Sequence, residues 1–318
     1  MSLSEDHRPA SCGSRARAVA ESIVPAGVGS DGLVGARADE VELNRDEHGD
    51  LERLAEWEPR AQRGQARLEP SSGELALLVR VSMPSTRFDE LVIYDTHRDS
   101  LELLRNEQRE RKRLAIHGLR PARRLLLTGP SGTGRALTAA ALASELNVPL
   151  FTIQPDRFVP GGEDQRARQL CLLAESMERT RGVYLLDASS LEGDALSACI
   201  SRLFLELEQV DGDSPFVLLL RGQDQLADRL VERFELSIHY FRPTRPIIDQ
   251  LIRRRLHRFD LRELSMPQLI GRAAELNHAQ ITGACERAAK SAILRNSPLV
   301  EQADLLRALE DERRRLRR

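Results

Sequence analysis

Continuous apolar runs alternate with amphipathic segments through the middle of the chain, from residue 123 to residue 243. Buried parallel strands are apolar on both faces because helices cover each side of the sheet, whereas the helices keep a polar outer face. Strands are predicted at 125–128, 149–153, 183–187, 216–220 and 236–241, and helices between them at 137–146, 165–179, 196–210 and 225–232. The alternation predicts an α/β domain over residues 123–243, with a parallel sheet and helices on both faces.

The pattern changes on either side of this domain. After Pro243 and Pro246 no strand-like run remains, and residues 244–318 predict a small all-α domain. Its four helices are predicted at 247–259, 267–276, 280–294 and 301–315. The pattern therefore predicts a helical C-terminal domain that follows the sheet.

The N-terminal part is predicted as two different regions. Residues 74–122 form an extension or linker, with a strand at 74–83 and a helix at 96–116. Residues 1–73 contain few large apolar groups and a single aromatic side chain, Trp57. Such a segment buries too little apolar surface to offset the entropy of ordering, so we expect a largely disordered leader.

The charge balance narrows the partners that we expect. There are 47 basic and 49 acidic residues, which gives a net charge of −2. A nearly neutral chain has no overall attraction to nucleic acid or to an anionic membrane. No apolar run is long enough to span a bilayer, the N-terminus has no signal-like apolar region, and the four cysteines lack CxxC spacing. We therefore expect a cytoplasmic protein with protein partners, and neither membrane nor nucleic acid as a partner.

A glycine-rich loop follows the first strand of the α/β domain and precedes a helix. Its residues are Gly129, Pro130, Ser131, Gly132, Thr133, Gly134, Arg135 and Ala136. Glycines at the first and sixth positions match the phosphate-loop spacing, in which backbone N–H groups and the helix N-terminus surround phosphate oxygens. The strand before the loop and the helix after it make the match specific, so the loop predicts binding of a nucleotide phosphate.

The residues that carry the chemistry of such a loop are altered. Arg135 replaces the lysine that reaches the phosphates, and Ala136 replaces the hydroxyl residue that binds Mg²⁺. Asp187 ends an apolar strand, where a carboxylate supports hydrated Mg²⁺, but the next residue is Ala188, where a glutamate base is expected. Only two of the 47 basic residues are lysines. A general drift from lysine to arginine could therefore explain Arg135, whereas it explains neither Ala136 nor Ala188.

From about residue 87 to about residue 313 the sequence resembles the AAA family of P-loop ATPases (AAA+), of bacterial type. The resemblance rests on GLRPARRLLLTGPSGTGRALTAAALASEL, on RGVYLLDA, and on the lid segment from Asn277 to Cys285. It implies a helical lid, binding of ATP or ADP, and assembly into homo- or hetero-oligomeric rings of AAA subunits. It also implies that Gly283 and Ala284 approach the adenine and ribose, and that Arg233 acts as an arginine finger for a neighbouring subunit.

Other positions of the family pattern are changed. The sensor asparagine after the fourth strand is missing, with Arg221 or Gln223 near its place, and Glu232 occupies one of the two arginine-finger positions. In the pore loop, Pro160 stands at the aromatic position and Phe158 lies two residues away. These changes put the gripping of a polypeptide in doubt.

The retained scaffold and the altered chemical residues favour a degenerate AAA module. We expect a structural or regulatory subunit that binds ATP or ADP weakly, with Mg²⁺ in question and hydrolysis weak or lost. One alternative is an active AAA ATPase that remodels or unfolds a protein substrate with non-standard catalytic residues. Another is an interaction protein that binds no nucleotide. The sequence alone leaves the enzymatic activity open between them.

Overall fold

The structure is a computed structural model that describes residues 78–154, 163–189, 212–222 and 231–316. The leader predicted for residues 1–73 and the helices predicted at 196–210 and 225–232 lie outside the described residues, apart from the last two positions of the second helix. Among the described residues, no helix is long and apolar enough to cross a membrane.

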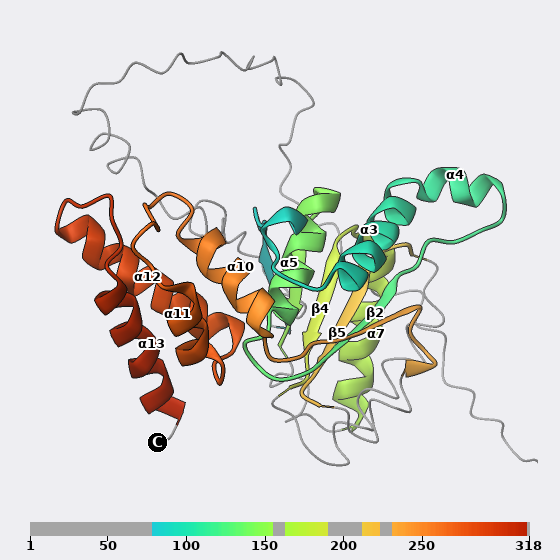
Figure 1. The fold of residues 1–318 in the computed structure, drawn as a ribbon. Coiled ribbons are helices and arrows are strands. Elements are labelled where there is room, and N and C mark those ends of the chain that lie inside the picture. Colours follow the sequence, from blue (N-terminus) through green and yellow to red (C-terminus); the bar gives the residue numbers. More distant parts are fainter. Residues whose placement is uncertain (1–77, 155–162, 190–211, 223–230, 317–318) are drawn as a thin grey trace, which may run out of the picture.

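The apolar runs of the α/β domain form one sheet (Figure 1). Its strands are β1 (Val79–Ser82), β2 (Arg124–Thr128), β3 (Leu150–Ile153), β4 (Val183–Asp187), β5 (Phe216–Leu220) and β6 (Leu236–His239). They lie in the order β1-β3-β4-β5-β2-β6, and β2 to β6 are parallel, as the sequence predicts. The first strand, β1, adds to the edge of the same sheet antiparallel to β3, so it belongs to the sheet although residue 123 was expected to begin the domain.

Helices cover both faces of this sheet. Helices α3 (Asp95–Arg109) and α5 (Arg135–Leu146) lie on one face, and α7 (Glu163–Arg179) lies on the other. Because neighbouring side chains of a strand point to opposite faces, Leu126 joins the core under α7 while Leu125 joins the core under α5. The predicted α/β class is confirmed.

The C-terminal residues form a helical lid with a core of its own. It consists of α10 (Arg245–Arg255), α11 (Met266–Ala273), α12 (His278–Leu294) and α13 (Gln302–Leu316), which lie together beside the α/β domain in Figure 1. Small residues of α12, such as Ala284 and Ala288, are fully buried and let α10 and α13 pack closely against it. The four observed helices agree with the four predicted from the sequence.

The N-terminal extension differs from the single helix predicted at 96–116. Two helices form instead, α3 and α4 (Arg111–Ile116), with the chain leaving helical geometry at Glu110 (φ −89°, ψ 11°). Four residues separate a short 3₁₀ segment, η3 (Phe88–Glu90), from the start of α3; this segment places the buried Phe88 against α5. The prediction of one continuous helix was therefore wrong, since hydrophobic spacing gives no signal for a break between charged residues.

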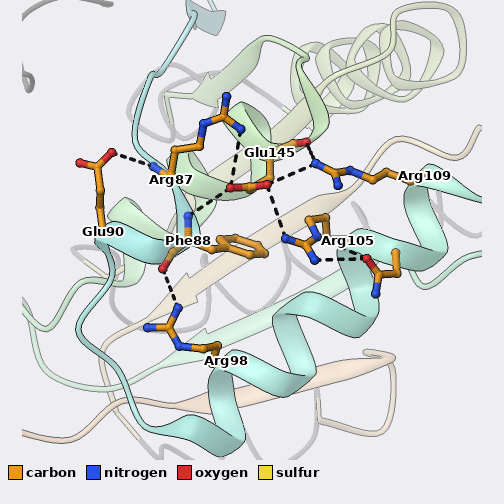
Figure 2. Close-up of polar contacts among 8 residues, drawn as sticks. Arg87, Phe88, Glu90, Arg98, Arg105, Arg109 and Glu145 are labelled. Carbon is orange, nitrogen blue, oxygen red and sulfur yellow. Dashed lines mark hydrogen bonds and ion pairs between the residues drawn. The ribbon is translucent and has the colours of Figure 1, made fainter. Parts of the chain in front are cut away.

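A buried carboxylate ties this extension to the end of α5. Figure 2 shows Glu145 facing three guanidinium groups, those of Arg87 (3.9 Å), Arg105 (3.6 Å) and Arg109 (3.2 Å). Glu145 also accepts a hydrogen bond from the backbone N–H of Phe88, and Arg109 donates to the main-chain carbonyl of Glu145 (2.7 Å). A carboxylate in the last turn of a helix is unfavourable by itself, so these cations compensate it and hold η3 and α3 against α5.

Candidate nucleotide-binding site

The glycine-rich loop takes a conformation that its glycines make possible. Gly129, Gly132 and Gly134 have positive φ values of 130°, 75° and 105°. A Cβ atom at Gly129 would lie 2.3 Å from the carbonyl oxygen of Tyr240, so any larger residue would push β6 away. Gly134 directly precedes α5 and offers no side chain to cap it. The first N–H groups of α5 therefore remain available for an anion.

The loop is held by its own residues and by the lid. Thr133 is buried and donates its hydroxyl hydrogen to the carbonyl of Pro130 (2.8 Å). The side-chain amide of Asn277 donates to the carbonyl of Ser131 (3.2 Å), and the backbone N–H of Ala279 donates to the carbonyl of Gly132 (3.0 Å). The N-terminus of α12 is thereby joined directly to the phosphate loop.

Arg135 is buried at the carboxyl edge of the sheet. Only 6% of its surface is exposed, and its guanidinium donates a hydrogen bond to the carbonyl of Leu220 at the end of β5. Burial lowers the pKa of Arg135, while the negative charge of Asp187 acts in the opposite direction. Because an arginine side chain stays protonated, the site contains a permanent buried positive charge.

The hydroxyl groups near the start of α5 do not replace the missing one. Ala136 is exposed and has only a methyl group. Thr138 is buried, and its hydroxyl contacts the phenol of Tyr240 (2.6 Å) and donates to the carbonyl of Gly134 (3.1 Å). The hydroxyl of Thr138 is thus directed into the fold.

Asp187 and Ala188 occupy the end of β4, close to the loop. Register pairs Asp187 with Leu219 of β5, and Leu220 with Thr128 of β2, so all these strand ends lie at one edge. Asp187 is exposed and accepts a hydrogen bond from the backbone N–H of Ser189 (3.0 Å). Ala188 is 2% exposed, and its N–H donates to the carbonyl of Leu219 (3.0 Å). The position expected to carry a catalytic base holds a buried methyl group.

Arg233 lies away from the chain's own loop. It is exposed and precedes β6, while the loop follows β2, and these two strands are parallel. The neighbouring Glu235 pairs with Arg124 at the beginning of β2 (2.8 Å), which fixes this end of the sheet. Arg233 and the loop are therefore at opposite edges of the sheet.

Of the other family positions, Glu232 and Arg221 are exposed, whereas Phe158, Pro160 and Gln223 lie outside the described residues.

The lid contacts the loop through the first residues of α12. Gly283 and Ala284 lie in the second turn of α12, where Ala284 is fully buried in the lid core. Asn277 and Ala279, at the first turn, make the contacts with the loop. The described geometry brings Asn277 and Ala279 to the loop, and the expected approach of Gly283 and Ala284 to the adenine and ribose stays a prediction.

A small cavity beside the loop was not predicted. It is lined by Tyr94, His97 of α3, Tyr240, Ile247 of α10 and His278 of α12, among other residues. Burial lowers the pKa of His278 to about 4, and burial together with the charge of His239 lowers the pKa of His97. The buried Nδ1 atoms of both rings lack a hydrogen-bond partner among the described residues. These side chains come from four segments, so the sequence offered no local signal for the cavity.

Comparison with known proteins identifies the class. Residues 125–240 match the family model described as "ATPase family associated with various cellular activities (AAA)". The chain is 26% identical over 230 residues to an uncharacterized AAA family ATPase of Sinorhizobium fredii, with 66% of each protein covered. With the fold and the loop described above, these matches show that the chain contains an AAA+ P-loop ATPase module, as the sequence motifs predicted.

Two further relatives are longer proteins. The chain is 23% identical over 261 residues to the ATP-dependent zinc metalloprotease FtsH of a Sulfurovum species, and 28% identical over 215 residues to FtsH 2 of Bdellovibrio bacteriovorus. The matches cover 75% and 61% of this chain but only 38% and 34% of those proteases. The chain thus spans little more than a third of each protease.

Proposed function

We propose that the chain is a nucleotide-binding AAA subunit with little or no ATP hydrolysis. Binding of ATP or ADP is supported by the open loop, by the uncapped N-terminus of α5 and by the buried charge of Arg135.

The environment of Ala188 is the main observation that argues against ATP hydrolysis. Its methyl group is buried, its backbone is fixed by Leu219, and it supplies no base at the end of β4. Absence of a general base lowers a rate by a factor of about 10² to 10⁴. The altered Arg135 and Ala136 add to this loss.

The position of Arg233 supports a role inside an assembly. AAA proteins generally form rings, and an exposed arginine at the edge opposite the loop suits a finger for the nucleotide of a neighbour. In this proposal the chain is a structural subunit of a homo- or hetero-oligomeric ring, and its own site binds nucleotide with little or no hydrolysis.

The test is equilibrium binding of ATP and ADP to the full chain, followed by a turnover assay in magnesium. We expect saturable binding and no turnover above spontaneous hydrolysis. Magnesium-dependent turnover that disappears in an Asp187→Ala variant would identify a working ATPase instead, with Glu192 or Asp194 as candidate bases. A complete lack of binding would identify an interaction protein.

A further inference from the structure

The AAA family implies a magnesium ion at this site, but the chain offers few of the side-chain oxygen atoms that would bind it. Mg²⁺ is octahedral and bound through oxygen, usually by one or two protein groups together with water and substrate phosphates. Among the described residues, Ala136 has no oxygen to offer, and the hydroxyl of Thr138 is directed to Tyr240. Asp187 remains, together with the hydroxyl of Ser189, which has no hydrogen-bond partner among the described residues. The position from which the loop normally supplies a magnesium ligand is therefore without an oxygen, and the described residues fit the ion only in part.

Arg135 already provides positive charge at this edge of the sheet. Its guanidinium donates a hydrogen bond to the carbonyl of Leu220 at the end of β5. Asp187 lies at the end of β4, the strand next to β5 in the sheet. Asp187 is also the largest favourable charge acting on Arg135. The guanidinium of Arg221 also acts on Arg135, so two guanidinium groups accompany the carboxylate of Asp187 at this edge of the sheet. A divalent cation bound at Asp187 would be repelled by the positive charge of Arg135.

The remaining N–H groups of Arg135 suit phosphate oxygens. A guanidinium carries five N–H donors in a planar fork, and the structure shows one of its terminal nitrogens directed to Leu220. Planar forks bind phosphate in a bidentate manner and carry a charge that does not titrate away. Arg135 is also the first residue of α5, so its guanidinium and the uncapped N–H groups belong to the same end of that helix.

We propose that this site binds nucleotide phosphates without a divalent cation, and that the guanidinium of Arg135 replaces both the lysine and the magnesium ion. The inference rests on the proposed nucleotide binding and adds the form of the ligand, a metal-free nucleoside diphosphate or triphosphate. It also accounts for the joint change of Arg135 and Ala136, because an arginine that supplies the charge removes the need for a metal-binding hydroxyl.

The first experiment uses the unaltered full chain. A fluorescent ADP analogue is titrated in excess EDTA and again in millimolar magnesium. We expect the two dissociation constants to agree within about threefold, since Ala136 offers the metal no hydroxyl and Arg135 supplies the positive charge. A rise in affinity of about tenfold or more with magnesium overturns the inference while leaving nucleotide binding intact. If the analogue binds in neither condition, the proposed function itself fails and the inference falls with it.

Two variants then identify the charge that replaces the metal. Arg135→Met keeps an unbranched stem but removes the guanidinium, and we expect it to weaken binding in EDTA by about tenfold or more. The double variant Arg135→Lys with Ala136→Thr restores the usual residues, and we expect its affinity to depend on magnesium. The single variant Arg135→Lys is the matched control, because it separates the effect of the lysine from that of the added threonine hydroxyl. Unchanged binding by a folded Arg135→Met variant, judged by thermal unfolding, overturns the inference.

Discussion

The side-chain amide of Asn277 in the lid donates a hydrogen bond to the carbonyl of Ser131 in the phosphate loop, at 3.2 Å across 146 residues of sequence. The same amide caps α12, because its oxygen accepts a hydrogen bond from the backbone N–H of Gln280 (2.9 Å), and the side-chain oxygen of Gln280 accepts one from the backbone N–H of Asn277 (2.9 Å). The start of the lid helix and the loop are therefore fixed by one residue, and movement of either affects the other.

Asn277→Ser separates the lid contact from the cap. Serine still accepts the N–H of Gln280 but has no amide donor for Ser131, so we expect a loss of about 0.5–1.5 kcal/mol in the free energy of unfolding. Hydrogen exchange at residues 129–134 should increase. Asn277→Ala removes both interactions and should lose about 1 kcal/mol more. Equal exchange in the loop of the serine variant and the unaltered protein would contradict the coupling.

Gly132→Ala tests the same contact from the loop. A Cβ atom at Gly132 would lie 2.5 Å from the side-chain nitrogen of Asn277, whereas one at Gly134 would meet nothing within 4 Å. Both glycines have positive φ, so each substitution introduces backbone strain of about 1–2 kcal/mol, but only Gly132→Ala adds a clash. Urea unfolding should show the larger destabilisation for Gly132→Ala.

An Asn277→Ala background provides the control for that comparison. Once the asparagine side chain is shortened, the two glycine variants should become similar in stability. A difference that persists in this background would place the clash elsewhere.

The coupling between the sheet and the N-terminal extension depends on Glu145. Glu145→Gln keeps the shape but removes the charge that faces Arg87, Arg105 and Arg109. Breaking a buried ion pair typically costs about 3–5 kcal/mol; because two of these arginines are about half exposed, we expect about 1–3 kcal/mol. Glu110→Gln, at an exposed position, is the matched control and should change stability by less than about 0.5 kcal/mol. Chemical denaturation measures both variants.

Stability should fall in mild acid because of His278. Its folded pKa of about 4 lies below the ordinary value of 6.5, so the unfolded chain binds a proton first as the pH decreases. The stabilisation is complete above pH 6.5 and is lost as the pH falls toward 4. Between about pH 7 and about pH 5 we expect a loss of about 2 kcal/mol from this residue. His278→Gln should flatten the corresponding part of a plot of unfolding free energy against pH, and an unchanged slope would exclude His278 as the cause.

The strands and the phosphate loop could be predicted because their signals are local. The run from Phe216 to Leu220 is apolar at every position and forms β5 over those same residues. The glycine spacing likewise predicts the loop, since positive φ values are required at residues close together in sequence. Each of these features depends on only a few consecutive residues.

The parts of the site that were missed depend on how distant segments meet. Tyr240 approaches Gly129 only because β6 lies next to β2, and Asn277 reaches Ser131 only because the lid turns back onto the loop. The guanidinium of Arg135 is turned to Leu220 by the burial around it, and the type of residue alone does not determine that direction.

Arg233 and the phosphate loop lie at opposite edges of one sheet, and this separation has a consequence for symmetry. An arginine that serves a neighbour's loop requires contact between two unlike surfaces, one from each subunit. Such a head-to-tail contact cannot be two-fold symmetric, and repetition generates either a closed ring or an open helix. If Arg233 acts on a neighbour, the assembly therefore has a direction: each subunit acts on the neighbour on one side and is acted upon by the neighbour on the other.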